Sequence, residues 1–148
     1  SKNDSIVIIA IKLIVRFRHK QDISLEQISY LLNSENQSVR KEIILAIREL
    51  VMFETNDILL QHFTKETNIR NKISIIKTLN VIGTSENIGF MSSLLNEDEN
   101  LELDLKLEII NFINKTDATF FQNFKFKDEE KNIELQKMIA HSNCPYLY

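Results

Sequence analysis

The sequence contains very little glycine, proline and cysteine and no tryptophan: its 148 residues include two Gly, one Pro and one Cys. Glycine and proline supply most tight turns, so their scarcity disfavours an all-β fold and favours helices joined by short polar loops. The single cysteine, Cys144, cannot form an intramolecular disulfide. A lone thiol is compatible with a reducing compartment, and we expect a cytoplasmic chain.

The composition also lacks the excess of positive charge that is typical of nucleic-acid-binding domains. Lys and Arg number 18 against 21 Asp and Glu, which gives a formal net charge of −3. No global field therefore attracts nucleic acid. Hydrophobic residues make up 43% and charged residues 26%, the balance of a folded globular domain, and the length is that of one domain with its own core.

The most hydrophobic run, residues 6–15 (IVIIAIKLIV), does not predict a membrane span. A span needs about 20 apolar residues, and Lys12 interrupts this run of ten. A signal peptide would carry its charges before the apolar run, whereas here Arg16, Arg18 and Lys20 follow it. The run is better interpreted as a helix that belongs to a repeat.

The repeat is centred on residues 38–55 (SVRKEIILAIRELVMFET), which have the apolar spacing of an amphipathic helix. A similar stretch follows thirty residues later in residues 68–85 (NIRNKISIIKTLNVIGTS). At this offset the matched pairs are Val39 with Ile69, Arg40 with Arg70, Ile43 with Ile73 and Val51 with Val81. Self-similarity at such a period predicts stacked helical repeats.

The N-terminal run aligns with the same helix. Residues 7–17 (VIIAIKLIVRF) match residues 43–53 (IILAIRELVMF) without a gap. We therefore predict a partial repeat at residues 5–20, and we expect its partner helix upstream of Ser1. An upstream membrane anchor is an alternative, with Arg16, Arg18 and Lys20 as inside-positive flanks, and the chain would then be the soluble part of a membrane-anchored protein.

Shorter helices are expected between the longer ones. Ser24 and Gln27 predict a capping box at the first, Asn56 or Asp57 is expected to cap the second, and Gly83 is expected to close the helix before the third. Residues 101–115 (LELDLKLEIINFINK) start with a strict alternation that, taken alone, predicts a strand. The apolar spacing that follows, matched to residues 73–76 at an offset of 34, predicts a helix instead. Asp117 is expected to cap another short helix, and a last helix is expected over residues 130–141, carrying Ile133, Leu135, Met138 and Ile139.

This pattern resembles the HEAT-repeat family of α-solenoids. The resemblance rests on the turn and helix start at residues 35–40 (ENQSVR) and 66–70 (ETNIR), whereas the third copy has Leu103 and Asp104 in place of Val-Arg and no repeat has the proline of the family's first helix. It implies an all-α, right-handed α-solenoid of about four helix pairs after one helix of an incomplete repeat. The expected repeats are residues 5–20 (partial), 24–55, 56–85, 86–116 and 117–142, followed by a tail at residues 143–148. The lack of tryptophan disfavours tetratricopeptide repeats, and armadillo-like three-helix units stay open.

No set of residues predicts catalysis or metal binding. His19 and His62 stand apart in the sequence, and His141 with Cys144 is only one pair, whereas structural zinc needs four ligands. The sequence has no nucleophile elbow, and the acidic residues at 97–99 and 128–130 precede predicted helices, whose N-termini favour negative charge. We expect no enzyme, no cofactor and no metal.

Two sets of basic residues have different expected roles. The resemblance implies that Arg40 and Arg70 bond to a neighbouring repeat and fix the stacking, and a ligand-facing role is the alternative. It also implies that the longer helices line a concave face, where the candidates for partner contact are Lys41, Arg48, Lys72, Lys77 and Lys106. Each of these has an ordinary solvated face as its alternative.

The function that the resemblance implies is a non-catalytic scaffold that binds a partner protein or peptide. Nucleic-acid binding and an accessory role beside a membrane enzyme are the alternatives, and the missing tryptophan and acidic net charge disfavour the first. The bare N-terminal helix is expected to be covered by a second copy of the chain, as a homodimer, or by another segment. The aromatic C-terminus, with Phe120, Phe121, Phe124, Phe126, Tyr146 and Tyr148, is expected to fill the core of the last repeat, and a peptide-binding patch is the alternative.

Overall fold

The computed structural model describes residues 2–98 and 100–142, and within these ranges every regular element is helical. The prediction of an all-α fold is therefore confirmed for the described residues. The α-helices are α1 (Lys2–Arg16), α2 (Leu25–Leu32), α3 (Gln37–Glu49), α4 (Asn56–Phe63), α5 (Ile69–Ile82), α6 (Ile88–Glu97), α7 (Leu103–Thr116), α8 (Phe120–Asn123) and α9 (Glu129–Ser142). Short 3₁₀ turns are η1 (Lys20–Asp22), η2 (Phe53–Thr55) and η3 (Ser85–Asn87).

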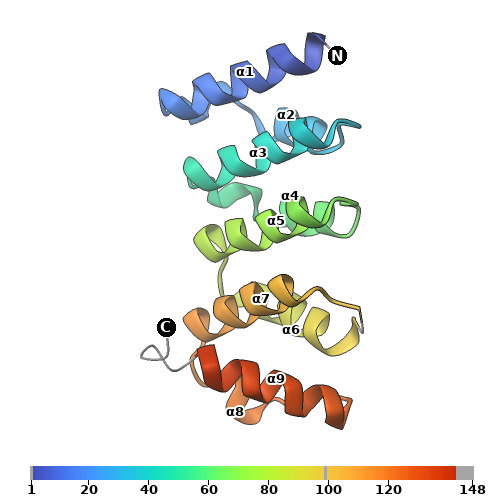
Figure 1. Cartoon of the computed structure of the whole chain (residues 1–148). Coiled ribbons are helices and arrows are strands. Elements are labelled where there is room, and N and C mark those ends of the chain that lie inside the picture. The colour runs from blue at the N-terminus through green and yellow to red at the C-terminus, as the bar shows by residue number, and fades with distance from the viewer. Residues whose placement is uncertain (1, 99, 143–148) are drawn as a thin grey trace. The chain divides into compact units, whose positions relative to one another are not determined.

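The chain divides into two compact units, residues 1–83 and residues 84–148. In the first unit α3 packs between α1 and α5, and these three long helices lie side by side (Figure 1). The short helices α2 and α4 pack against α3 and α5, respectively. In the second unit α7 packs against both α6 and α9.

Helices α3 and α5 bury the same positions at an offset of 32 residues, not 30. The matched buried pairs are Val39 with Asn71, Ile43 with Ile75, Ile44 with Ile76, Ala46 with Thr78, Ile47 with Leu79 and Leu50 with Ile82. The N-caps Asn36 and Asn68 have the same offset. The predicted alignment is wrong because it matched residues by likeness, and so paired Val39, which is 1% exposed, with Ile69, which is 41% exposed.

Helix α7 repeats the buried positions of α5 at an offset of 34 residues, as predicted. Its buried residues Leu105, Ile109, Ile110, Phe112 and Ile113 fall on residues 71, 75, 76, 78 and 79. The alternating start of this stretch does not form a strand, because α7 begins at Leu103 and continues with helical spacing.

The helix ends confirm one predicted cap and correct three. One of the three is Asp117, because the N-cap of α8 is Thr119. Ser24 and Gln27 form the predicted capping box at α2. The N-cap of α4 is Thr55, which belongs to η2, so neither Asn56 nor Asp57 has that role. Gly83 follows α5 with an extended backbone (φ −74°, ψ 161°) and not with the left-handed conformation of a typical C′ glycine.

The left-handed position is instead occupied by Arg18 after α1 and by Val51 after α3, with φ of 57° and 51°. After α3 the Met52 N–H donates to the Ile47 carbonyl and the Val51 N–H donates to the Arg48 carbonyl, which together make a Schellman motif. Equivalent bonds close α1. A β-branched residue at positive φ is strained, and the two closing hydrogen bonds hold Val51 there.

Helix α1 has one packed face and one exposed apolar face. Only Ile11 of this helix is buried, whereas an apolar stripe of Ile6, Ile9, Leu13 and the following Phe17 is exposed, from 48% to 64% per residue. We call these four residues the α1 stripe. None of the described helices has the combined length and apolar character that would let it cross a membrane.

Four phenylalanine side chains near the end of the second unit pack on one another. Phe121 and Phe126 are buried and Phe120 and Phe124 are half-buried, with ring contacts joining them. This confirms a core role for Phe121 and Phe126, whereas Tyr146 and Tyr148 lie outside the described residues. In α9 the buried residues are Leu135 and Ile139, and Ile133, which was expected to face the core, is 59% exposed.

Candidate functional site

Arg40 joins α3 to the turn between α4 and α5. Its guanidinium donates to both carboxylate oxygens of Glu66, at 3.0 Å from Nη2 to Oε1 and 3.0 Å from Nε to Oε2. It also donates to the carbonyls of Ser34 and Glu35, in the turn before α3. One side chain thus links two successive interhelical turns.

Glu66 and His62 complete this buried cluster. His62 Nε2 lies 2.7 Å from Glu66 Oε2, and the Asn68 N–H donates to Glu66 Oε1. Burial raises the pKa of Glu66, but hydrogen bonds from Arg40, His62 and Asn68 and the charge of Arg40 outweigh it and lower the pKa from 4.5 to about 2. Because an ionised carboxylate only accepts hydrogen bonds, His62 Nε2 is the donor in this pair.

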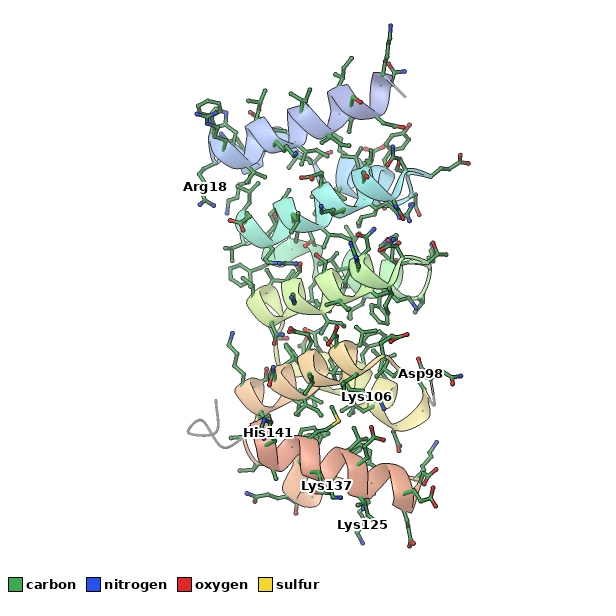
Figure 2. The ribbon with its side chains drawn as sticks, viewed as in Figure 1. Arg18, Asp98, Lys106, Lys125, Lys137 and His141 are labelled. Carbon is green, nitrogen blue, oxygen red and sulfur yellow. The ribbon has the colours of Figure 1, made fainter. Side chains whose placement is uncertain are left out.

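Arg70 does not share this role. At the offset of 32 the residue equivalent to Arg40 is Lys72, which lies 5.3 Å above the ring centre of Phe63. The equivalent residue on α7 is Lys106, which is labelled in Figure 2. Its Nζ lies 3.3 Å from Oε1 of Glu134 on α9. Arg40, Lys72 and Lys106 therefore occupy one repeat position, and each contacts a neighbouring element of its own unit.

Arg48 also lies between helices. Its guanidinium donates to the carbonyl and hydroxyl of Ser74, at 2.9 and 2.6 Å, and to the Thr78 hydroxyl, at 3.2 Å. These contacts tie α3 to α5 in the part-buried interface. The guanidinium of Arg48 therefore forms hydrogen bonds within the fold, whereas the sequence predicted that it would contact a partner.

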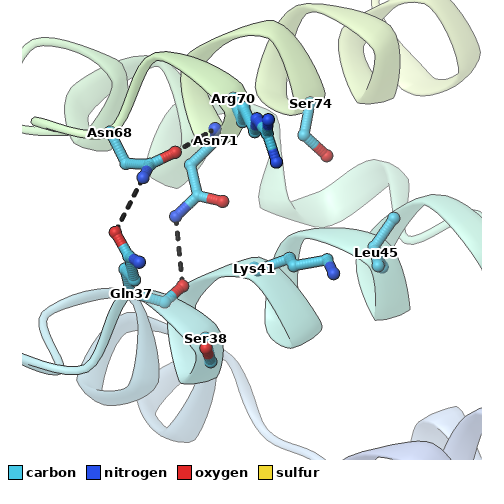
Figure 3. A pocket seen from close by; sticks show the side chains of 8 residues that line it. All are labelled: Gln37, Ser38, Lys41, Leu45, Asn68, Arg70, Asn71 and Ser74. Atoms are coloured by element: carbon cyan, nitrogen blue, oxygen red, sulfur yellow. Dashed lines mark hydrogen bonds between the residues drawn. The ribbon is translucent and has the colours of Figure 1, made fainter.

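A groove of about 470 Å³ lies between α3 and α5, and it brings together residues that the sequence placed in different roles. Figure 3 shows that Lys41 and Arg70 extend into the space between the two helices. We call this space the α3–α5 groove. Its lining residues are Gln37, Ser38, Lys41, Leu45, Asn68, Arg70, Asn71 and Ser74.

At one end of the groove, amide side chains of the lining residues form hydrogen bonds between α3 and α5. Asn68 Nδ2 donates to Gln37 Oε1 at 2.7 Å, and Asn71 Nδ2 donates to the Gln37 carbonyl at 3.2 Å (Figure 3). Asn68 also caps α5, because its side-chain oxygen accepts from the Asn71 N–H. These bonds hold the first turns of α3 and α5 next to each other.

The charge of the groove is positive. Lys41 and Arg70 are exposed, and neither forms an ion pair or a hydrogen bond with any described residue. No carboxylate is among the lining residues. Of the other predicted contact residues, Lys77 is exposed on α5 and interacts within the chain, and it lies outside the groove lining.

Sequence reasoning did not identify the amides and the buried carboxylate of this region. It interpreted His62 as isolated and Glu66 only as part of a turn, yet the two contact each other at the helical spacing of i and i+4. The signal that was available is the recurrence of Asn36 and Asn68 at an offset of 32, both as N-caps.

The described residues contain no group of three or more His, Cys, Asp or Glu arranged to hold a metal ion. His19 pairs with Asp22 at 3.2 Å, and Cys144 lies outside the described residues. Comparisons of the chain with protein-family models, with curated proteins and with solved structures find no match.

Proposed function

We propose that this chain is a non-catalytic interaction domain built from HEAT-like helix pairs, and that it binds a partner protein or peptide in the α3–α5 groove. The observation that carries the proposal is the groove itself, a positively charged hollow of about 470 Å³ between two adjacent repeats. Lys41 and Arg70 form no ion pair or hydrogen bond with any described residue, so their charges are available to a partner.

The repeat organisation supports the HEAT-like assignment. Short helices α2 and α4 each pack against the long helix that follows, and the buried positions recur at offsets of 32 and 34 residues along α3, α5 and α7. A right-handed solenoid of about four helix pairs, preceded by the unpaired α1, is the architecture that we propose from this recurrence. Such stacking creates extended surfaces on which partners bind.

The chemistry of the lining supports recognition as its role. Amide, hydroxyl, ammonium and guanidinium groups donate and accept hydrogen bonds, and Leu45 adds an apolar surface. The hydroxyls of Ser38 and Ser74 have no imidazole or carboxylate beside them among the eight lining residues to act as a general base. Ser74 instead accepts from Arg48.

Site-specific photocrosslinking in cells that carry the gene tests the proposal. Benzoylphenylalanine replaces Ser38, an exposed residue of the groove, and in the control it replaces Thr64, an exposed residue after α4. We expect a discrete adduct with a partner protein from position 38 and none from position 64. Adducts at equal yield from both positions, or from neither, would contradict a partner-binding groove.

A further inference from the structure

Two cations face the α3–α5 groove without counter-charges. Two other basic residues of the first unit have carboxylate partners: Arg40 pairs with Glu66 at 3.0 Å, and Lys12 lies 3.9 Å from Glu42. The carboxylates of Glu66 and Glu42 are therefore already paired with Arg40 and Lys12. The charge of Lys41 and Arg70 is therefore left for a ligand.

The first turns of α3 and α5 add to this positive potential. Both helices begin beside the groove, at Gln37 and Ile69, and both are longer than eight residues. The dipole at a helix N-terminus favours negative charge. The helix dipoles therefore add to the positive potential that Lys41 and Arg70 create in the groove.

The remaining lining residues favour a peptide over a nucleic acid. Gln37 and Asn68 present amides, which have the same donors and acceptors as a peptide backbone. None of the eight lining residues is aromatic, so the groove offers no ring on which a base would stack. Leu45 provides an apolar contact for the methylene groups of a side chain.

We infer that the partner bound in the α3–α5 groove is an acidic peptide segment, with an Asp or Glu carboxylate placed between Lys41 and Arg70. This inference rests on the proposed function of the groove as the partner-binding surface. Arg70 donates to the carboxylate through its planar fork, and Lys41 contributes a point charge. The amides of the lining bind the backbone of the segment.

The test uses two dye-labelled ten-residue probes, (Glu-Ser)₅ and (Gln-Ser)₅, with the full chain at low salt. A hydrogen bond to a charged group contributes roughly 1.5–3 kcal/mol, so we expect the glutamate probe to bind at least about tenfold more tightly. Fluorescence anisotropy gives the affinities. Amide chemical shifts of a ¹⁵N-labelled chain locate the binding, and we expect the changes at residues 37–45 and 68–74.

The decisive variant is the double substitution Lys41→Gln and Arg70→Gln. We expect it to abolish the preference for glutamate over glutamine. Its matched control is Lys125→Gln with Lys137→Gln, which removes two exposed positive charges from the second unit (Figure 2). The control changes net charge equally, so we expect it to keep the preference.

Three results would overturn the inference. The first is equal affinity for the two probes, and the second is an equal loss of preference in both double variants, which would indicate general charge attraction. The third is a single-stranded (dT)₁₀ oligonucleotide that binds at the groove more tightly than the glutamate probe. A partner crosslinked from position 38 together with any of these results would leave the proposed function standing and refute only the acidic-peptide inference.

Discussion

The Nη2 atom of Arg40 lies 3.0 Å from Oε1 of Glu66, and this ion pair is almost wholly enclosed, with side-chain exposures of 11% and 0%. The pair joins α3 to the turn that precedes α5. His62, from α4, contacts the same carboxylate at 2.7 Å. Three elements of the first unit thus converge on one buried negative charge.

We predict that Glu66 makes the stability of the first unit dependent on acid pH. Its pKa is about 2 in the folded chain and 4.5 when unperturbed, which corresponds to roughly 3 kcal/mol of stabilisation at neutral pH. Because the folded pKa is the lower one, this stabilisation is complete above about pH 5 and is lost as the pH falls from there to about 2. Urea unfolding at several pH values measures it.

The variant Glu66→Gln isolates this contribution from those of other carboxylates. At pH 7 it leaves Arg40 buried without a counter-charge, and a loss of roughly 3–5 kcal/mol is expected. The difference from the native chain is expected to shrink below pH 4.5. Glu35→Gln, at an exposed carboxylate, is the control and is expected to have little effect. A difference that stays constant between pH 7 and pH 3 would contradict the prediction.

Replacing Val51 with glycine is predicted to stabilise the chain. The native residue has φ of 51°, which is strained for a β-branched side chain and free of strain for glycine. We expect a gain of roughly 1 kcal/mol after the greater entropy of the unfolded glycine chain is included. Thermal and urea unfolding provide the measurement.

Val81→Gly provides a control with the same change of side chain. Val81 lies within α5 and is 44% exposed, so glycine there is expected to destabilise the chain, because its helix propensity is lower than that of valine. Opposite signs at positions 51 and 81 are the expected outcome. Destabilisation by both substitutions would indicate that the Schellman motif carries no strain at Val51.

The offset of 32 residues predicts which isoleucine of α5 is a core residue. Ile75 is fully buried and matches Ile43, whereas the 30-residue alignment assigns that place to Ile73, which is half-buried. Ile75→Ala is expected to cost roughly 2–5 kcal/mol through the lost contacts and the cavity that it leaves. Ile73→Ala is expected to cost much less, and the reverse order would support the 30-residue alignment.

The α1 stripe is predicted to cause self-association. Ile6, Ile9, Leu13 and Phe17 lie on one exposed face, and contiguous apolar surface of this kind marks interaction sites. Light scattering over a range of concentrations is expected to give a mass that rises above the monomer, and Ile9→Lys is expected to restore the monomer. Ile133→Lys, at an isolated exposed isoleucine of α9, is expected to leave the mass unchanged. A monomer at all concentrations would refute the prediction.

Helix content and most helix positions could be predicted because apolar spacing records which face of a helix is buried. The capping box of Ser24 and Gln27 could be predicted for a similar reason, since both partners are close in sequence. The offset between α3 and α5 could not, because Asn71 takes a buried position that is apolar in α3 and α7. Its burial depends on the Gln37 carbonyl, which is distant in the sequence.

The candidate site was predicted only in part. Lys41 and Arg70 were both identified, but with different roles, and only the structure brings them to one groove. Arg48 was expected on an open face, and its contacts with Ser74 and Thr78 depend on how two helices pack. The sequence shows which residues are charged, whereas the tertiary structure determines which residue of opposite charge, if any, lies beside each of them.

Hydrogen bonds join α3 to α5 at two places along the α3–α5 groove. Gln37 accepts from Asn68 and Asn71 near the helix starts, and Arg48 binds Ser74 and Thr78 further along. The distance between the two helices is therefore fixed before any ligand arrives. A preorganised site of this kind loses little conformational entropy when a ligand binds, so most of the entropy loss occurs in the incoming segment. The speed of capture is then governed by diffusion and electrostatic attraction, and salt slows it.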